Sequence, residues 1–82
     1  MSMQLKPLIT EKAVMMIEAQ NTLTFMTEKN VSKDEIKKEI ESLFSVKTDK
    51  IRSLVRGNHK YFYLKLKKEF PAIDVATKLG LI

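Results

Sequence analysis

Residues 50–68 read Lys-Ile-Arg-Ser-Leu-Val-Arg-Gly-Asn-His-Lys-Tyr-Phe-Tyr-Leu-Lys-Leu-Lys-Lys, and their alternation predicts two β-strands joined by a tight turn. Gly57 and Asn58 can both take the positive φ angles that two-residue hairpin turns use. One face of the hairpin is expected to meet a core and carries Ile51, Ser53, Val55, Phe62, Leu64 and Leu66. The opposite face carries Lys50, Arg52, Leu54, Arg56, Tyr61, Tyr63, Lys65 and Lys67. The hairpin is therefore amphipathic, and its outer face is basic.

This hairpin also holds the whole excess of positive charge. Seven of the 15 basic residues lie in it, and none of the ten acidic residues does. The rest of the chain has eight basic and ten acidic residues, so that part carries −2 while the whole chain carries +5. Segregated charge of this kind favours a polyanionic partner. A basic protein that is merely soluble would be expected to scatter its charge.

Length and composition favour one small domain without covalent cross-links. A chain of 82 residues is expected to fold around a single, small core. Because it has no cysteine, it can form neither disulfides nor thiolate metal sites, which fits a reducing compartment. No apolar run approaches the ~18 residues of a membrane span, and the N-terminus lacks the apolar region of a signal peptide. We therefore expect a cytoplasmic protein.

The N-terminal part predicts an extended segment, a helix and a strand. Residues 4–9 are extended because Pro7 disfavours helix before it, which leaves room for a short edge strand. Thr10 can cap a helix over residues 10–19 whose apolar side carries Ala13, Val14, Met16 and Ile17. The next stretch alternates, with Leu23 and Phe25 on one face and Thr22, Thr24 and Met26 on the other. This alternation is typical of a half-buried strand.

Two further helices are expected, one on each side of the hairpin in the chain. Ser32 and Glu35 form a capping box, and Val31 and Ile36 are spaced as a hydrophobic staple. The inward face of this helix is predicted to carry Ile36, Ile40, Leu43 and Phe44. Pro71 suits the first turn of the last helix, and Gly80 suits its C-terminal cap. Its apolar side is predicted to carry Ile73, Ala76 and Leu79, with Val75 beside them.

The order helix, strand, helix, strand, strand, helix predicts an α+β fold with three main antiparallel strands, to which a short N-terminal strand can add a fourth. If the long helix crosses back over the sheet, the last strand lies between the other two. The predicted sheet side of the core consists of Leu23, Phe25, Ile51, Val55, Phe62, Leu64 and Leu66. The pattern leaves open which face the last helix covers. It also leaves open whether Met26 and Leu54, on the other face, lie under a helix or contact a partner.

Catalysis is poorly supported by the residue types present. His59 is the single histidine, and a histidine beside a turn is far more often a solvated residue or a nucleic-acid contact than a general base. The acidic neighbours Asp34-Glu35 and Glu39–Glu41 lie at a helix cap and on a lysine-rich helix face, where they support the helix. There is neither a glycine-rich phosphate loop nor a metal-ligand spacing. We expect no enzyme activity, no metal and no cofactor.

The outer face of the hairpin is the best candidate site. Arg52, Arg56, Lys65 and Lys67 can neutralise phosphates, and Tyr61 and Tyr63 can stack on bases or riboses. Lysine on an exposed strand also discourages aggregation, so a purely solvated face is the alternative interpretation. A face kept only for solubility would normally mix charge signs, whereas residues 50–68 contain no acid. The pattern therefore favours RNA binding.

Four segments carry a resemblance to a known family: Pro7–Ala13 (PLITEKA), Asn21–Phe25 (NTLTF), Leu54–Tyr61 (LVRGNHKY) and Asp74–Gly80 (DVATKLG). In order and spacing they resemble the L-twenty-three family of large-ribosomal-subunit proteins over essentially the whole chain. The bacterial members carry a long basic hairpin extension, whereas the turn here spans only residues 57–59. The chain therefore resembles the archaeal or eukaryotic-core form, and we do not expect its hairpin to reach into the tunnel wall.

This resemblance implies a structural, non-enzymatic protein that binds large-subunit rRNA near the polypeptide exit tunnel, among neighbouring ribosomal proteins. It implies RNA contacts from the N-terminal motif at Lys6, Thr10 and Lys12. It implies further RNA contacts from the hairpin at Arg56, Asn58, His59 and Lys60. Glu11 matches an exposed acidic position on the side where targeting or chaperone factors dock. Residues 1–82 are thus expected to form a single rRNA-binding domain.

Two other classes of function stay open from the residues alone. A free-standing RNA or DNA chaperone module would bind many unrelated nucleic acids with similar affinity. A protein-interaction adaptor would use the exposed strand edge or the last helix, and would keep its partner after charge removal.

Overall fold

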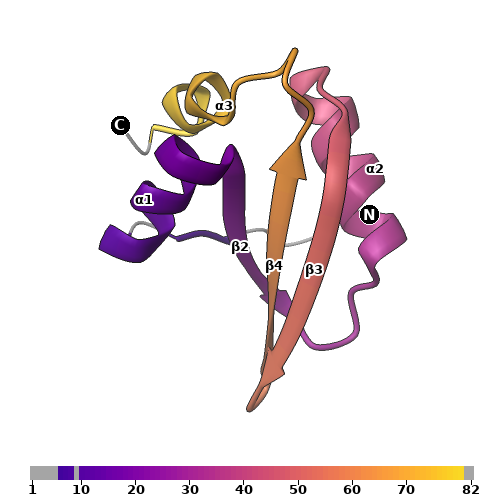
Figure 1. The fold of residues 1–82 in the computed structure, drawn as a ribbon. Helices are drawn as coiled ribbons and strands as arrows, with labels where there is room; N and C mark the ends of the chain where they lie inside the picture. Colours follow the sequence, from indigo (N-terminus) through magenta and orange to yellow (C-terminus); the bar gives the residue numbers. More distant parts are fainter. Residues whose placement is uncertain (1–5, 9, 81–82) are drawn as a thin grey trace.

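The computed structural model describes residues 6–8 and 10–80, so part of the expected extended segment 4–9 lies outside the described residues. The elements are β1 (Lys6–Pro7), α1 (Glu11–Gln20), β2 (Thr22–Glu28), α2 (Lys33–Phe44), β3 (Thr48–Arg56), β4 (His59–Leu66) and α3 (Ala72–Lys78). Figure 1 shows α2 beside β3, and α1 and α3 together near the start of β2. The predicted α+β fold is confirmed, and β1 is the short additional strand.

The four strands form one antiparallel sheet in the order β1-β2-β4-β3. The last strand therefore lies between β2 and β3, as predicted. Leu64 of β4 is the direct partner of Leu23 in β2 and of Ile51 in β3. Because direct antiparallel partners point to the same side of a sheet, this register fixes a core face and an outer face. The core face carries Leu64, and the outer face carries Tyr63.

The turn between β3 and β4 consists of Gly57 and Asn58. Gly57 has a φ of +65°, whereas Asn58 is outside the positive-φ region. A single positive φ at the first turn residue is typical of a type II′ turn, which favours glycine there. Only one of the two residues expected to take positive φ does so.

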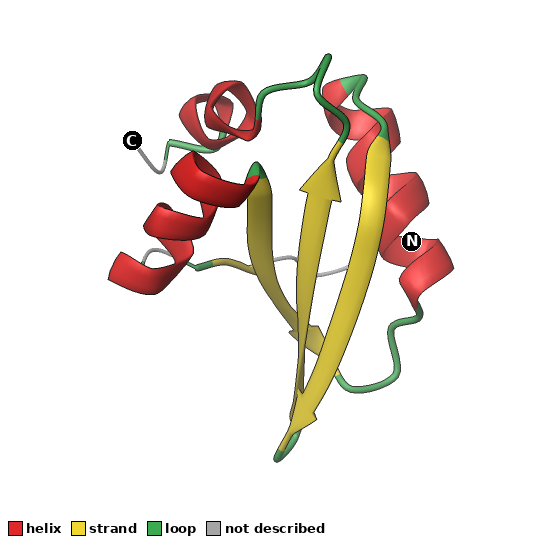
Figure 2. Cartoon of the chain, viewed as in Figure 1, coloured by secondary structure: helices red, strands yellow, loops and turns green. Residues whose placement is uncertain are grey.

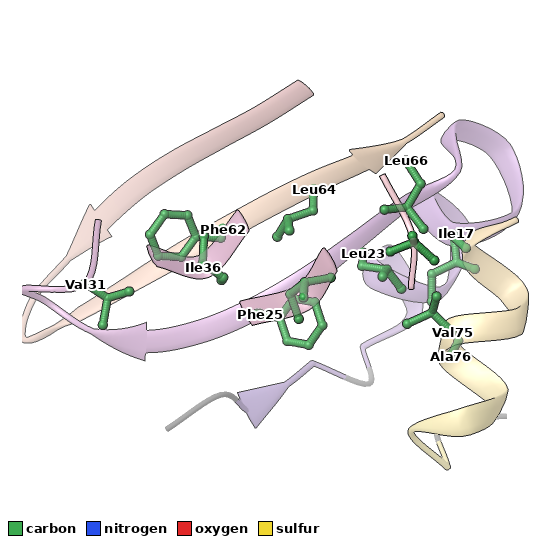
Figure 3. Close-up of a cluster of buried hydrophobic side chains, with 13 residues drawn as sticks. Ile17, Leu23, Phe25, Val31, Ile36, Phe62, Leu64, Leu66, Val75 and Ala76 are labelled. Atoms are coloured by element: carbon green, nitrogen blue, oxygen red, sulfur yellow. The ribbon is translucent and has the colours of Figure 1, made fainter. Parts of the chain in front are cut away.

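One hydrophobic cluster joins the core face of the sheet to all three helices. Its large, fully buried members come mainly from the sheet and α2: Leu23, Phe25, Ile36, Ile40, Phe62, Leu64 and Leu66. Figure 3 shows this row of side chains, which runs from Val31 near the hairpin end to Val75 and Ala76 in α3. The last helix therefore packs onto the same core, and it contacts both α1 and β2. This answers the question that the sequence left open.

Helix α2 begins as predicted, but its apolar face is narrower than expected. Ser32 and Glu35 form the reciprocal capping box, and Val31 and Ile36 are both buried. Leu43, however, is 60% exposed, so its assignment to the core was wrong. The Glu41 carboxylate accepts hydrogen bonds from the backbone N–H of Thr48 at 2.9 Å and from its hydroxyl at 3.1 Å. Because this contact turns the Glu41 flank of the helix toward β3, Leu43 on the opposite flank turns toward solvent.

Val55 was also wrongly assigned to the core, since it is 51% exposed. Its partner in the register is Lys60, next to the turn. The far end of the hairpin extends beyond the helices, as Figure 2 shows, and β3 is an edge strand. A core-face residue at this end therefore has no helix to pack against.

In α3 the buried side differs from the predicted one. Ala72, Val75 and Ala76 are buried, whereas Ile73 is 38% exposed. The Ala72 backbone N–H donates to the side-chain oxygen of Asn21 at 2.6 Å. This bond fixes the start of the helix with Ala72 inward, which places Ile73 on the outer side.

Strand β2 was predicted to be half-buried, but side chains on both of its faces are buried. Thr22 and Thr24 lie on the outer face, yet they are only 4% and 6% exposed. Helix α1 packs against this strand, and the Thr22 hydroxyl donates to the Gln20 carbonyl at the end of that helix. The outer face is thus partly covered by α1 at β2 and open at β3 and β4.

Candidate nucleic-acid interface

The outer face of the hairpin gathers most of the predicted site residues. Arg52 lies directly opposite Tyr63, and Arg56 lies directly opposite His59. Two more direct pairs on this face are Lys50 with Lys65 and Leu54 with Tyr61. The basic residues are exposed and both tyrosines are half-buried. Cations and aromatic rings therefore alternate on one accessible surface, as the sequence predicted.

A pocket of about 420 Å³ lies between this face and α1. Its lining residues are Lys12, Met16, Gln20, Thr22, Lys50, Arg52, Ser53, Tyr63 and Lys65. Lys12 belongs to the N-terminal motif, about forty residues before the hairpin in the sequence. The fold brings this lysine to the same pocket as Arg52 and Lys65. Two motifs that the sequence presented separately thus form one cationic site.

Lys60 lies on the other side of the sheet. Its register partners are Thr27 and Val55, and its ammonium donates to the Val31 carbonyl oxygen at 2.9 Å. The same ammonium lies 5.3 Å from the centre of the Phe62 ring. This lysine therefore ties the hairpin to the loop before α2.

The remaining predicted RNA contacts come from the turn, the end of β4, the N-cap of α1 and β1. Asn58 is exposed in the turn, and Lys67 is exposed just beyond the end of β4. Thr10 is the N-cap of α1, where its hydroxyl accepts a hydrogen bond from the Ala13 N–H at 3.1 Å. Lys6 of β1 pairs with Met26 of β2, and only the backbone of Lys6 is described.

Comparison with known proteins adds an independent observation. The sequence pattern of the family Ribosomal protein L23 matches residues 2–72. The Large ribosomal subunit protein uL23 of Trypanosoma brucei brucei is 44% identical over 77 residues, which are 93% of this chain and 47% of that protein. The chain belongs to the Ribosomal protein L23 family. It spans about half the length of this curated relative.

Membership of the L23 family confirms the resemblance found in the sequence motifs. The matched region contains the N-terminal motif, both strands of the hairpin and the first residue of the last helix, Ala72. All of the outer-face residues described above thus lie within the L23 match.

Five residues that line the L23 pocket were absent from the predicted site: Met16, Gln20, Thr22, Lys50 and Ser53. Lys50 shares the outer-face alternation with Arg52, so the same pattern could have found it. Met16 and Gln20 could not be predicted, because the sequence does not show which part of the sheet lies beside that side of α1. They follow Lys12 at intervals of four residues and therefore line one side of the helix.

The L23 outer face is not free of acidic residues. Glu28, at the end of β2, lies directly opposite His59. The positive charge is therefore strongest at the α1 end of the hairpin, around the pocket, and weaker near the turn.

Glu11, the predicted docking position, is exposed in the first turn of α1. It borders a shallow hollow together with Thr10, Val14 and Met15. Met15 is 66% exposed, which is the largest exposure among the large apolar residues that the structure describes. The L23 chain thus presents a small acidic and apolar surface apart from the cationic pocket.

Residues 6–8 and 10–80 contain no candidate for a membrane span or for a metal site. None of the helices there is both long enough and apolar enough to span a lipid bilayer. No group of three or more histidine, cysteine, aspartate or glutamate side chains is placed to hold a metal ion in that part of the chain.

Proposed function

We propose that residues 1–82 form a single domain that binds large-subunit rRNA as a structural, non-enzymatic component of the cytoplasmic ribosome. The observation that carries the proposal is the convergence of Lys12 with Lys50, Arg52 and Lys65 around Tyr63, in a chain of the L23 family. Cations from three separate elements gather on an open surface. Such a surface has the charge and the shape to lie against a phosphate backbone.

The mechanism is neutralisation of phosphates by the outer face, with the fold acting as a rigid support. Arg52 and Lys65 are held in fixed register on neighbouring antiparallel strands, and α1 brings Lys12 to them. Little ordering of the backbone is needed on binding, because sheet and helix are already packed on the core. Such a surface reads mainly the shape of the RNA rather than its base sequence.

Binding measurements over a salt series test this proposal. Large-subunit rRNA fragments and unrelated RNA of equal length are titrated with the protein and with Arg52→Ala/Arg56→Ala/Lys65→Ala. The matched control is Lys33→Ala/Lys37→Ala/Lys38→Ala, which removes the same charge from the exposed face of α2. Each lost phosphate contact reduces the slope of log K against log salt by ~0.7–0.9, so the loss of three contacts in the hairpin variant should reduce it by ~2.1–2.7.

The control variant should keep the slope of the unmodified protein. Equal losses in both triple variants would show that only net charge matters, which contradicts an outer-face site. Equal affinity for rRNA and unrelated RNA would favour the alternative, a general nucleic-acid chaperone.

A location near the polypeptide exit tunnel, beside neighbouring ribosomal proteins, is part of the same proposal. It is supported by family membership and by the surface around Glu11 and Met15, which lies apart from the cationic pocket. A targeting or chaperone factor could dock there while RNA occupies the hairpin. Ribosomes carrying Glu11→Lys should then lose factor binding but keep this protein, and loss of the protein itself would contradict the separation.

A further inference from the structure

The pocket beside α1 differs in form from the rest of the outer face. Its volume of about 420 Å³ falls in the ~300–1,000 Å³ range of pockets that hold small molecules. One wall is the line of Lys12, Met16 and Gln20 on successive turns of α1, and the other is the hairpin. A flat basic surface would suffice to hold a phosphate backbone. A hollow of this size has room for a chemical group that projects from that backbone.

The charges around the pocket favour an anionic occupant. Lys12, Lys50, Arg52 and Lys65 reach it from α1, β3 and β4. No acidic side chain is among the described residues that line it. Four positive groups around one hollow repel each other, and a bound phosphate would relieve that repulsion.

The uncharged lining residues point to a flat apolar body attached to that phosphate. Tyr63 on the hairpin and Met16 on α1 form the apolar parts of the two walls. An aromatic ring stacks on a nucleobase, and a polarisable thioether packs well against flat rings. Gln20 is exposed at the rim, where its amide offers both a donor and an acceptor to the edge of a base. Inorganic phosphate alone would leave these groups unused.

A base can enter such a pocket only when it is unpaired. In an A-form helix the bases are stacked on each other and the major groove is too narrow for side chains. We propose that the pocket binds one unpaired nucleotide of the RNA, with its base between Tyr63 and Met16 and its phosphates on the four surrounding cations. This inference rests on the proposed RNA-binding function and names the feature of the RNA that is recognised.

Three short RNA duplexes of the same sequence test the inference by fluorescence anisotropy. The first has one unpaired adenosine at its centre, the second has an abasic nucleotide at that position, and the third is fully paired. The protein should bind the first duplex at least about fivefold more tightly than the other two. This factor corresponds to the lower end of the range of free energies for stacking one base on an aromatic side chain. The unpaired base, rather than local flexibility of the backbone, then accounts for the preference.

Tyr61 and Tyr63 lie on the same face of β4 and provide a matched pair of variants. Tyr63→Leu should abolish the preference for the unpaired base, whereas Tyr61→Leu should keep it, since Tyr61 lies on the same face outside the pocket. Met16→Ala should reduce the preference for the unpaired base, because it alters the opposite wall of the pocket. If Tyr63→Leu does not fold, this variant tests the pocket in its place. Thermal unfolding establishes that each variant is folded.

The outcomes separate this inference from the proposed function. Equal, salt-dependent affinity for all three duplexes would overturn the nucleotide pocket and leave RNA binding intact. Equal affinity for the unpaired and abasic duplexes, both above the paired one, would also overturn it, because the backbone alone would then be bound. Binding that is weak and independent of salt for every RNA would overturn the proposed function itself.

Discussion

The side-chain oxygen of Asn21 accepts a hydrogen bond of 2.6 Å from the backbone N–H of Ala72, 51 residues further along the chain. Asn21 is the C-cap of α1 and has a φ of +52°. Its amide nitrogen lies within 3.1–3.3 Å of the carbonyl oxygens of Leu66, Lys67 and Phe70. One side chain thus joins the end of α1, the segment after β4 and the start of α3.

We expect Asn21→Gly to lower the free energy of unfolding by roughly 1–3 kcal/mol, the cost of leaving such backbone groups unpaired. Glycine adopts the left-handed conformation readily, so the loss reports the hydrogen bonds rather than backbone strain. Asn21→Asp should destabilise further, because it places a carboxylate against three carbonyl oxygens. Urea denaturation measures both, with Asn30→Gly in an exposed turn as the control. A loss at Asn30 as large as that at Asn21 would contradict the joining role.

The contact between Glu41 and Thr48 predicts a dependence of stability on pH. The backbone N–H of Thr48 donates to the Glu41 carboxylate and lowers the pKa of Glu41 below its ordinary value of 4.5. Burial of the carboxylate opposes this shift, while the Thr48 hydroxyl and the charges of Lys37 and Lys47 reinforce it. Because the folded-state pKa lies below that of the unfolded chain, the contact contributes stability above pH 4.5. That contribution is lost as the pH falls through the folded-state pKa.

The variant Glu41→Gln should therefore be less stable than the unmodified protein at pH 7, by up to about 1 kcal/mol. The difference should shrink as the pH is lowered below 4.5. Urea midpoints measured from pH 7 to pH 3 check this, and Glu18→Gln at an exposed position of α1 controls for the change in net charge. A difference between the two proteins that stays constant over the whole range would refute the pKa argument.

The parts of the fold that depend on local patterns could be predicted from the sequence. The capping box of α2, the alternation of β4 and the order of elements each arise from neighbouring residues, whose spacing sets the period. The errors at Leu43, Val55 and Ile73 have a common physical cause. Each fits the apolar periodicity of its helix or strand. A contact with a residue outside that element, or a position near the end of a strand, determines whether its side chain is buried.

In the candidate site, too, local patterns predict some features and packing decides the others. Strand alternation was enough to place Arg52, Tyr63 and Lys65 on one face. It could not show that α1 adds Lys12 to that face, nor that the Lys60 ammonium bonds to the carbonyl of Val31. Those two facts depend on how α1 and the loop before α2 pack, which no local pattern specifies.

The turn of the hairpin offers a test of backbone conformation alone. Gly57 has a φ of +65°, and a Cβ placed there would meet no atom within 4 Å. We expect Gly57→Ala to cost about 1–2 kcal/mol, because an L-residue is strained in the left-handed region even in open space. Asn58→Ala should cost less, since Asn58 lies outside that region. Thermal unfolding of both variants measures the difference, and equal losses would argue against a strained position at Gly57.

Lys60 and Lys65 lie on the same strand and point to opposite faces of the sheet, so they separate stability from binding. Lys60→Met removes the hydrogen bond to the Val31 carbonyl and should lower the free energy of unfolding by about 0.5–1.5 kcal/mol. It should leave the salt dependence of RNA binding unchanged. Lys65→Met should do the reverse, with stability within about 0.5 kcal/mol of the unmodified protein.

For Lys65→Met the slope of log K against log salt should fall by ~0.7–0.9, the value for one phosphate contact. Urea denaturation and RNA titration over the same salt series measure both quantities on the same two proteins. Because each change removes one positive charge, net charge cannot produce opposite results. A reduced slope for Lys60→Met with an unchanged slope for Lys65→Met would place the RNA on the core side of the hairpin and contradict an outer-face site.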